Sequence, residues 1–226
     1  MQHYTYILLL VSTLAFPLYK SFEKKIEFYK NWKHLFPSIL ISAVIFIVAD
    51  VWFTSIGIWK FNPDYVIGIN ILNLPIEEWL FFFIAPFSSV FIHEVLNYFV
   101  KKNPIDKYAS VITYTLIGFC AVIAGLNTHK IYTAVLFTSL AGFLLLHLAL
   151  LKTEVIGKFF LTWLVCCIPF AIFDGFITAM PIAVYNDAEN LGIRLYTIPL
   201  EDVFYCMLNL LLVITCYEYF KRRKTI

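Results

Sequence analysis

Residues 75–98 read PIEEWLFFFIAPFSSVFIHEVLNY, and residues 199–220 read PLEDVFYCMLNLLLVITCYEYF. Each stretch opens with a proline and two acidic residues and continues with an apolar run of roughly 20 residues, the length a helix needs to cross a bilayer. The whole chain is similarly apolar: 61% of its 226 residues are hydrophobic and 14% are charged, whereas soluble domains carry roughly 25% charged residues. We therefore expect an integral membrane protein.

Windows of this length predict an all-α polytopic membrane protein with seven transmembrane helices. The segment before the first span has no basic residue and the lysines follow it, so this span is interpreted as a retained anchor and not as a secretory signal. The predicted spans cover residues 4–19, 36–54, 76–98, 108–126, 131–150, 159–180 and 200–220.

The basic residues indicate the orientation of the chain. If successive loops alternate between the two faces, 14 of the 17 lysines and arginines share one face, Lys152 and Lys224 among them, and Lys60, Lys130 and Arg194 remain on the other. The positive-inside rule then places the N-terminus outside and the C-terminus in the cytoplasm. This distribution predicts contact with the lipid bilayer and no nucleic-acid partner, and it is compatible with a homo-oligomer.

An internal repeat organises the chain. A shift of 124 residues superimposes the region of the second and third spans on that of the sixth and seventh without a gap. The first span then corresponds to the fifth, so we predict two parallel three-helix repeats, residues 1–100 and 131–226, joined by a linker helix at 101–130. The matched polar residues are Asp50 with Asp174, Thr54 with Thr178, Glu77 with Glu201, Glu78 with Asp202, and Glu94 with Glu218.

The repeat predicts that six carboxyl groups lie at one depth, near the outer face. Attraction to the helix macrodipole would account for any one of them, but the matched set of six favours a functional site. Glu94 follows Glu77 by 17 residues, roughly 25 Å along a helix, so it belongs to a deeper layer. The candidate catalytic residues, which we call the acid layer, are Asp50, Glu77, Glu78, Asp174, Glu201 and Asp202.

Carboxylic acids crowded into apolar surroundings can donate a proton at one point and accept one at another, because desolvation and mutual repulsion favour a shared proton. Aromatic rings near them can stabilise a carbocation through their faces. Acid, base and aromatic walls together suit the cyclisation of a polyene through a cation. The candidate substrate-binding residues are Trp52, Thr54, Trp59, Trp79, Phe81, Thr178 and Tyr205.

The run from Asp50 to Pro63, followed by Gly68 and the segment 74–82, resembles the lycopene cyclase domain of the heterodimeric or fused type found in bacteria, archaea and fungi. The Pro-x-Glu-(Glu/Asp) motif of that family occurs twice, at residues 75–78 and 199–202. The resemblance covers nearly the whole chain. It implies a lycopene β-cyclase in the cytoplasmic membrane of a bacterium or archaeon, which turns the linear ψ-ends of lycopene into β-ionone rings by way of γ-carotene to β-carotene.

The second repeat departs from the family pattern, because Pro181 and Ala183 replace Gly57 and Trp59. The two halves are therefore expected to do different work. No glycine-rich dinucleotide fingerprint is present, so no flavin or dinucleotide cofactor is expected. The histidines show no paired ligand spacing, so no metal is expected either.

Two other functions are compatible with the same residues. An intramembrane prenyltransferase, such as a lycopene elongase, would need aspartate-rich diphosphate motifs with Mg²⁺, whereas Asp50 and Asp174 each lack a nearby aspartate partner. A non-catalytic carotenoid-binding or transport protein would need an apolar cavity but no reactive acids.

Overall fold

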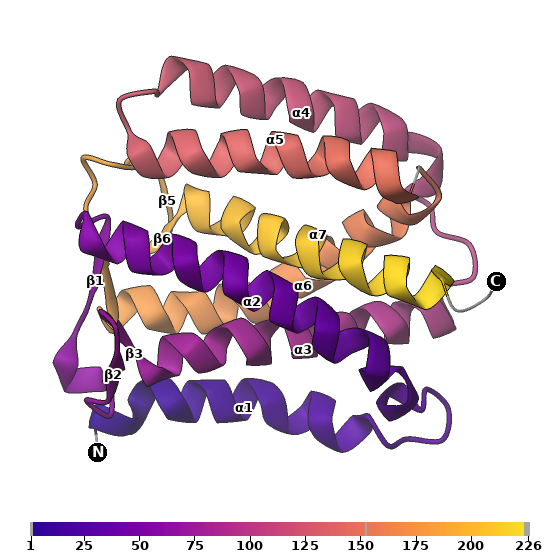
Figure 1. Ribbon diagram of the computed structural model, residues 1–226, viewed down its shortest axis with the longest axis horizontal. Coiled ribbons are helices and arrows are strands. Elements are labelled where there is room, and N and C mark those ends of the chain that lie inside the picture. The colour runs from indigo at the N-terminus through magenta and orange to yellow at the C-terminus, as the bar shows by residue number, and fades with distance from the viewer. Residues whose placement is uncertain (1, 152, 224–226) are drawn as a thin grey trace.

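The computed structural model describes residues 2–151 and 153–223, so Lys152 and Lys224 lie outside the described residues. Within these described residues, seven α-helices run side by side in a bundle (Figure 1). Six of them are long and apolar enough to cross a membrane, and α1, with 16 residues, is the shortest. The helices are α1 (Thr5–Lys20), α2 (Trp32–Ser55), α3 (Ile76–Phe99), α4 (Ala109–Leu126), α5 (Ile131–Leu151), α6 (Thr153–Ala179) and α7 (Leu200–Arg223).

The outward surfaces of the bundle are apolar, as expected of helices that face lipid. Val48, Val111 and Ile168 are each 66% exposed, although their side chains are entirely aliphatic. Such helices are hydrophobic on all sides, which distinguishes membrane spans from the amphipathic helices of soluble bundles. The prediction of an all-α membrane protein is therefore confirmed. The largest difference in boundaries is at α6, which begins at Thr153 and not near residue 159.

Helices α3 and α7 form the centre of the bundle. The first packs against α1, α2, α6 and α7, and the second packs against α2, α3, α5 and α6. Helix α4 lies at the edge, mainly against α5, where Figure 1 shows it as the outermost helix on that side. The two motif-bearing helices are therefore surrounded by the others, which buries the acidic first turn of each.

Short strands, which the sequence did not predict, cover the acidic end of the bundle. β1 (Trp59–Phe61) pairs antiparallel with β4 (Ala183–Tyr185), with Lys60 opposite Val184. β2 (Asn70–Ile71) pairs with β3 (Leu74–Pro75), and β5 (Arg194–Leu195) pairs with β6 (Ile198–Pro199). Every strand of the first half thus recurs 124 residues later.

The loops that lead into α3 and α7 are also built alike. The backbone N–H of Ile67 donates to Glu77 Oε1 over 2.7 Å, and that of Leu191 donates to Glu201 Oε1 over the same distance. Gly68 and Gly192, one residue after each donor, both adopt positive φ, where a side chain would be strained. The equivalences that the sequence repeat predicted therefore extend to individual hydrogen bonds.

Candidate functional site

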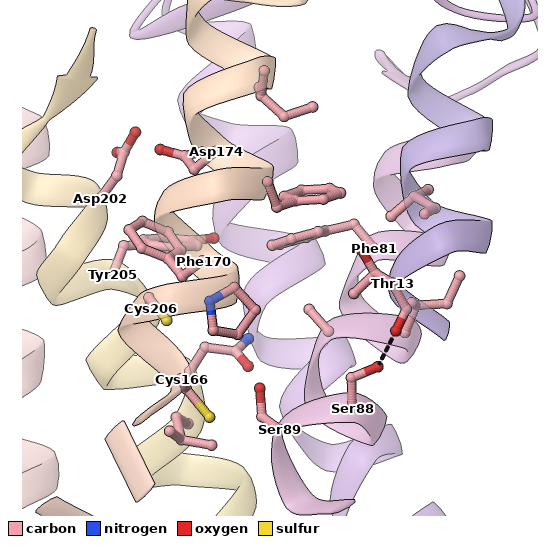
Figure 2. Close-up of a pocket in the computed structure, with 18 of the residues that line it drawn as sticks. Thr13, Phe81, Ser88, Ser89, Cys166, Phe170, Asp174, Asp202, Tyr205 and Cys206 are labelled. Carbon is pink, nitrogen blue, oxygen red and sulfur yellow. Dashed lines mark hydrogen bonds between the residues drawn. The ribbon is translucent and has the colours of Figure 1, made fainter. Parts of the chain in front are cut away.

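A cavity of about 350 Å³ begins at the acidic end of the bundle and runs down between α1, α3, α6 and α7. Its volume falls within the usual range of ligand pockets. Figure 2 shows Asp174 and Asp202 facing one another at one end, with Ser88, Ser89 and Cys166 toward the other. Four of the six carboxyl groups of the acid layer line the cavity: Asp50, Glu78, Asp174 and Asp202.

Asp50 is held by donors from its own repeat. The indole N–H of Trp59 donates to Asp50 Oδ1 over 2.7 Å, and the Thr54 hydroxyl lies 3.5 Å from the same oxygen. Asp50 is 1% exposed, so these contacts replace the water that the carboxyl group loses on burial. β1 delivers Trp59 to this position after the turn that ends α2.

In each repeat, a tyrosine donates a hydrogen bond to the second acid of the motif. The Tyr6 hydroxyl donates to Glu78 Oε2, and the Tyr132 hydroxyl donates to Asp202 Oδ1, both over 2.6 Å. Tyr6 comes from α1 and Tyr132 from α5, so the outer helix of each repeat fixes the second acid of the motif on the central helix. Both tyrosines are almost fully buried, where a short hydrogen bond to a carboxyl group is strong.

The Tyr185 hydroxyl, on β4, is a further partner of Asp202. Burial raises the pKa of Tyr185 well above its usual value, so this phenol keeps its proton beside Asp202. Asp202 thus interacts with two tyrosine hydroxyls.

Asp174 differs from the other three acids of the cavity. Among the residues that the structure describes, no hydrogen bond reaches either oxygen of its carboxyl group, whereas Asp50, Glu78 and Asp202 each accept one from a side chain. Its counterpart Asp50 receives the indole N–H of Trp59, but the residue equivalent to Trp59 in the second repeat is Ala183, which carries no donor. The carboxyl group of Asp202 faces that of Asp174 across the end of the cavity (Figure 2). The substitution noted in the sequence therefore removes a donor from one aspartate of a matched pair.

Glu77 and Glu201 are fully buried but do not line the cavity. Each accepts a hydrogen bond from a backbone N–H in the loop before its helix, Glu77 from Ile67 and Glu201 from Leu191. Glu201 Oε1 also accepts a hydrogen bond from the Thr133 hydroxyl over 2.7 Å. The acid layer therefore divides into four groups that face the cavity and two that face the backbone.

The candidate substrate-binding residues divide in the same way. Trp59, Phe81 and Tyr205 line the cavity. The Thr178 hydroxyl donates to the Asp174 carbonyl over 2.8 Å and does not reach the carboxyl group. Trp52 is 44% exposed on the outer surface, and Trp79 lines a separate apolar groove against α2.

Aromatic rings surround the upper cavity. Phe81 stacks on Phe173, with centroids 5.8 Å apart and planes 18° apart. Trp59 meets Tyr205 edge to face at 6.4 Å. Ring faces of this kind attract a cation, most strongly where water is excluded. The arrangement combines aromatic walls with protonatable groups.

Sequence reasoning missed Tyr6, Tyr132 and Tyr185. A signal for the first two exists: a shift of 126 residues, two more than the main repeat, aligns His3 and Tyr6 with His129 and Tyr132. A search restricted to the gapless shift of 124 places Leu8, and not Tyr6, opposite Tyr132.

At the opposite end of the bundle, His93, Glu94 and Glu218 lie within 4.8 Å of one another, a spacing suited to a metal ion. Protein groups already contact each of them: His93 Nε2 is 3.3 Å from Glu218 Oε1, and Lys221 Nζ is 2.8 Å from Glu94 Oε1. We interpret this cluster as an ion-pair network that joins α3 to α7.

The family profile described as lycopene cyclase matches residues 3–96 and 129–220, which together make up most of the chain. The matched segments begin 126 residues apart and end 124 residues apart, which are the offsets of the paired tyrosines and of the acids. Neither a curated protein nor a solved structure matches the chain. The duplicated acids, their tyrosine partners and the aromatic cavity thus occur in a chain that belongs to the lycopene cyclase family.

Proposed function

We propose that the protein is a lycopene β-cyclase that closes β-ionone rings by proton transfer, with Asp174 as the proton donor and Asp202 as the base. Membership of the family supports a carotenoid cyclase with a lipophilic substrate in the membrane. The observation that carries the assignment of roles is the unequal supply of hydrogen-bond donors to the four acids of the cavity.

Asp174 is suited to donate a proton because no described group donates a hydrogen bond to either of its carboxyl oxygens, whereas Asp202 accepts one from Tyr132. A buried carboxylate without donors is costly, whereas the neutral acid carries its own O–H to give away. Asp202 is suited to accept a proton because the Tyr132 and Tyr185 hydroxyls stabilise its carboxylate. The two acids face one another at the end of the cavity (Figure 2).

The reaction then balances without any redox partner. The Asp174 O–H protonates the inner CH carbon of the terminal double bond, which leaves a tertiary cation on the outer, dimethyl carbon. The next double bond of the chain attacks this cation, closes the six-membered ring and moves the positive charge to a second tertiary carbon. Asp202 removes the proton from the neighbouring ring carbon that carries the polyene chain, which forms the double bond of the β-ring. Because product and substrate are isomers, this proposal requires no flavin or dinucleotide.

Asp50 and Glu78 stabilise the cation in this scheme through their negative charge, together with the faces of Trp59 and Phe81. Return of the proton from Asp202 to Asp174, which faces it at the end of the cavity, resets the site. Glu77 and Glu201 position the loops before α3 and α7 and take no part in proton transfer.

The prenyltransferase alternative is disfavoured by the cavity itself. A prenyl diphosphate needs cationic groups beside its phosphates, and the described residues that line the cavity include no lysine or arginine. Incubating membranes with a prenyl diphosphate, Mg²⁺ and lycopene tests this directly, since a lengthened carotenoid would favour that alternative.

The experiment that tests the proposal is expression in bacteria that accumulate lycopene, followed by chromatographic analysis of the pigments. We expect bicyclic β-carotene. Unchanged lycopene in cells whose membranes contain the protein would refute the cyclase assignment.

A further inference from the structure

The acid chamber, formed by the four cavity acids Asp50, Glu78, Asp174 and Asp202, contains equivalent residues from both repeats. Two identical halves would therefore be expected to carry two equivalent passages away from this chamber, one for each repeat. Among the described residues, the cavity extends from the chamber along α1, α3 and α6, with part of α7.

Side-chain size explains the asymmetry. Ser88 and Ser89 line the passage on α3, whereas their equivalents on α7, Leu212 and Val213, are buried in the core. These small polar residues leave open a volume that the larger apolar residues fill in the other half.

Cys206, which lines the cavity on α7, is likewise a small residue whose equivalent in the other repeat is large. Its equivalent on α3 is Phe82, which is 1% exposed and packs against Phe46 with ring centroids 5.9 Å apart. The place where a second passage would run is thus occupied by aromatic packing.

The open passage is long and leads toward lipid. Ser89 follows Glu78 by 11 residues, which places it about 16 Å farther along the helix. Phe16 lines the passage on α1 and is 63% exposed on the outer surface. Pro169, on α6, also both lines the passage and is exposed. The passage therefore opens between α1 and α6, on an apolar surface.

We propose that the protein cyclises one end of its substrate at a time in a single site, while the rest of the polyene extends through the passage between α1 and α6 into the bilayer. This inference rests on the proposed cyclase function. A linear chain held in this way presents one end to Asp174 and Asp202, and its other end reaches them only after the molecule has left and turned round. The monocyclic product must therefore be released before the second ring forms.

Two measurements test this inference. In the first, membranes with wild-type protein receive lycopene in large excess over enzyme, and the pigments are followed with time. We expect monocyclic carotene to accumulate before bicyclic carotene, and added monocyclic carotene to be cyclised. Bicyclic product from the earliest time points, without free monocyclic carotene, would overturn the inference. Absence of any ring would overturn the proposed function and, with it, the inference.

The second measurement closes the passage with the residues of the other repeat, as the double variant Ser88→Leu, Ser89→Val. Ring formation should fall about 100-fold, because the chain can no longer align its end with the acids. Ser12→Leu, on the exposed face of α1 outside the cavity, makes a similar change and should act like wild type. An active double variant would overturn the inference, and the time course provides a test that does not depend on how that variant folds.

Discussion

Lys60 pairs with Val184, the residue 124 positions later, across the antiparallel strands β1 and β4. Because each is the equivalent of the other, the local twofold axis that relates the repeats passes between them. The hydrogen bonds beside this pair obey the same symmetry: the Asn62 N–H donates to the Ile182 carbonyl, and the Asn186 N–H donates to the Ile58 carbonyl. The strands therefore join the two repeats next to the acids.

Replacement of Asp174 by asparagine should reduce ring formation about 10²- to 10⁴-fold, the usual contribution of a general acid. Asparagine keeps the shape of the side chain but removes the proton that starts the reaction. Pigment analysis in lycopene-accumulating bacteria, normalised to the protein in the membrane fraction, measures the effect. Asp64→Asn changes an exposed acid outside the cavity and should leave activity unchanged. Full activity of Asp174→Asn would assign the proton donor elsewhere.

Trp59→Phe should lower ring formation about tenfold, since a hydrogen bond to a charged group contributes about 1.5–3 kcal/mol. The substitution keeps an aromatic ring in the cavity wall but removes the N–H that donates to Asp50 Oδ1. The rate should be measured at saturating substrate, where the loss of a transition-state contact shows as a lower kcat. Trp32→Phe, near the opposite end of α2, is the matched control. An unchanged kcat in Trp59→Phe would show that Asp50 does not depend on its indole partner.

Glu77→Gln should affect stability more than chemistry. Glu77 is fully buried and accepts the Ile67 N–H, and loss of a charged acceptor should lower the free energy of unfolding by about 1–3 kcal/mol. Thermal inactivation of the detergent-solubilised protein checks this, with activity then measured per folded molecule. Glu78→Gln, in the cavity, should show the opposite pattern: near-normal stability and reduced ring formation. If Glu77→Gln is stable but inactive, Glu77 belongs to the reacting groups, as the sequence motif alone suggested.

The fold was largely predictable because bilayer spans and acid positions leave strong signals. A shift of 124 residues aligned Asp50 with Asp174 and Glu77 with Glu201, and the structure places these residues at the same end of the bundle. The strands were not predictable, because β2 and β5 are two residues long and carry no periodicity that a sequence pattern can reveal.

The direction of each side chain was the harder part of the site. Glu77 and Glu78 are neighbours in one motif, yet successive helical residues point about 100° apart, so one faces the loop and the other faces the cavity. The passage depends on serines at 88 and 89 where the second repeat has leucine and valine. Such a difference in size acquires meaning only when the packing around it is known.

Orientation in the membrane remains a prediction from the distribution of charge, and it can be tested by labelling cysteines. Tyr196, in the turn between β5 and β6 at the acidic end, is 90% exposed, and Lys102, at the other end, is also exposed. In a background without the native cysteines, Tyr196→Cys should react with a membrane-impermeant thiol reagent in intact cells. Lys102→Cys should react only after the cells are opened, because the positive-inside rule places that loop in the cytoplasm. The reverse pattern would place the acids near the cytoplasmic face.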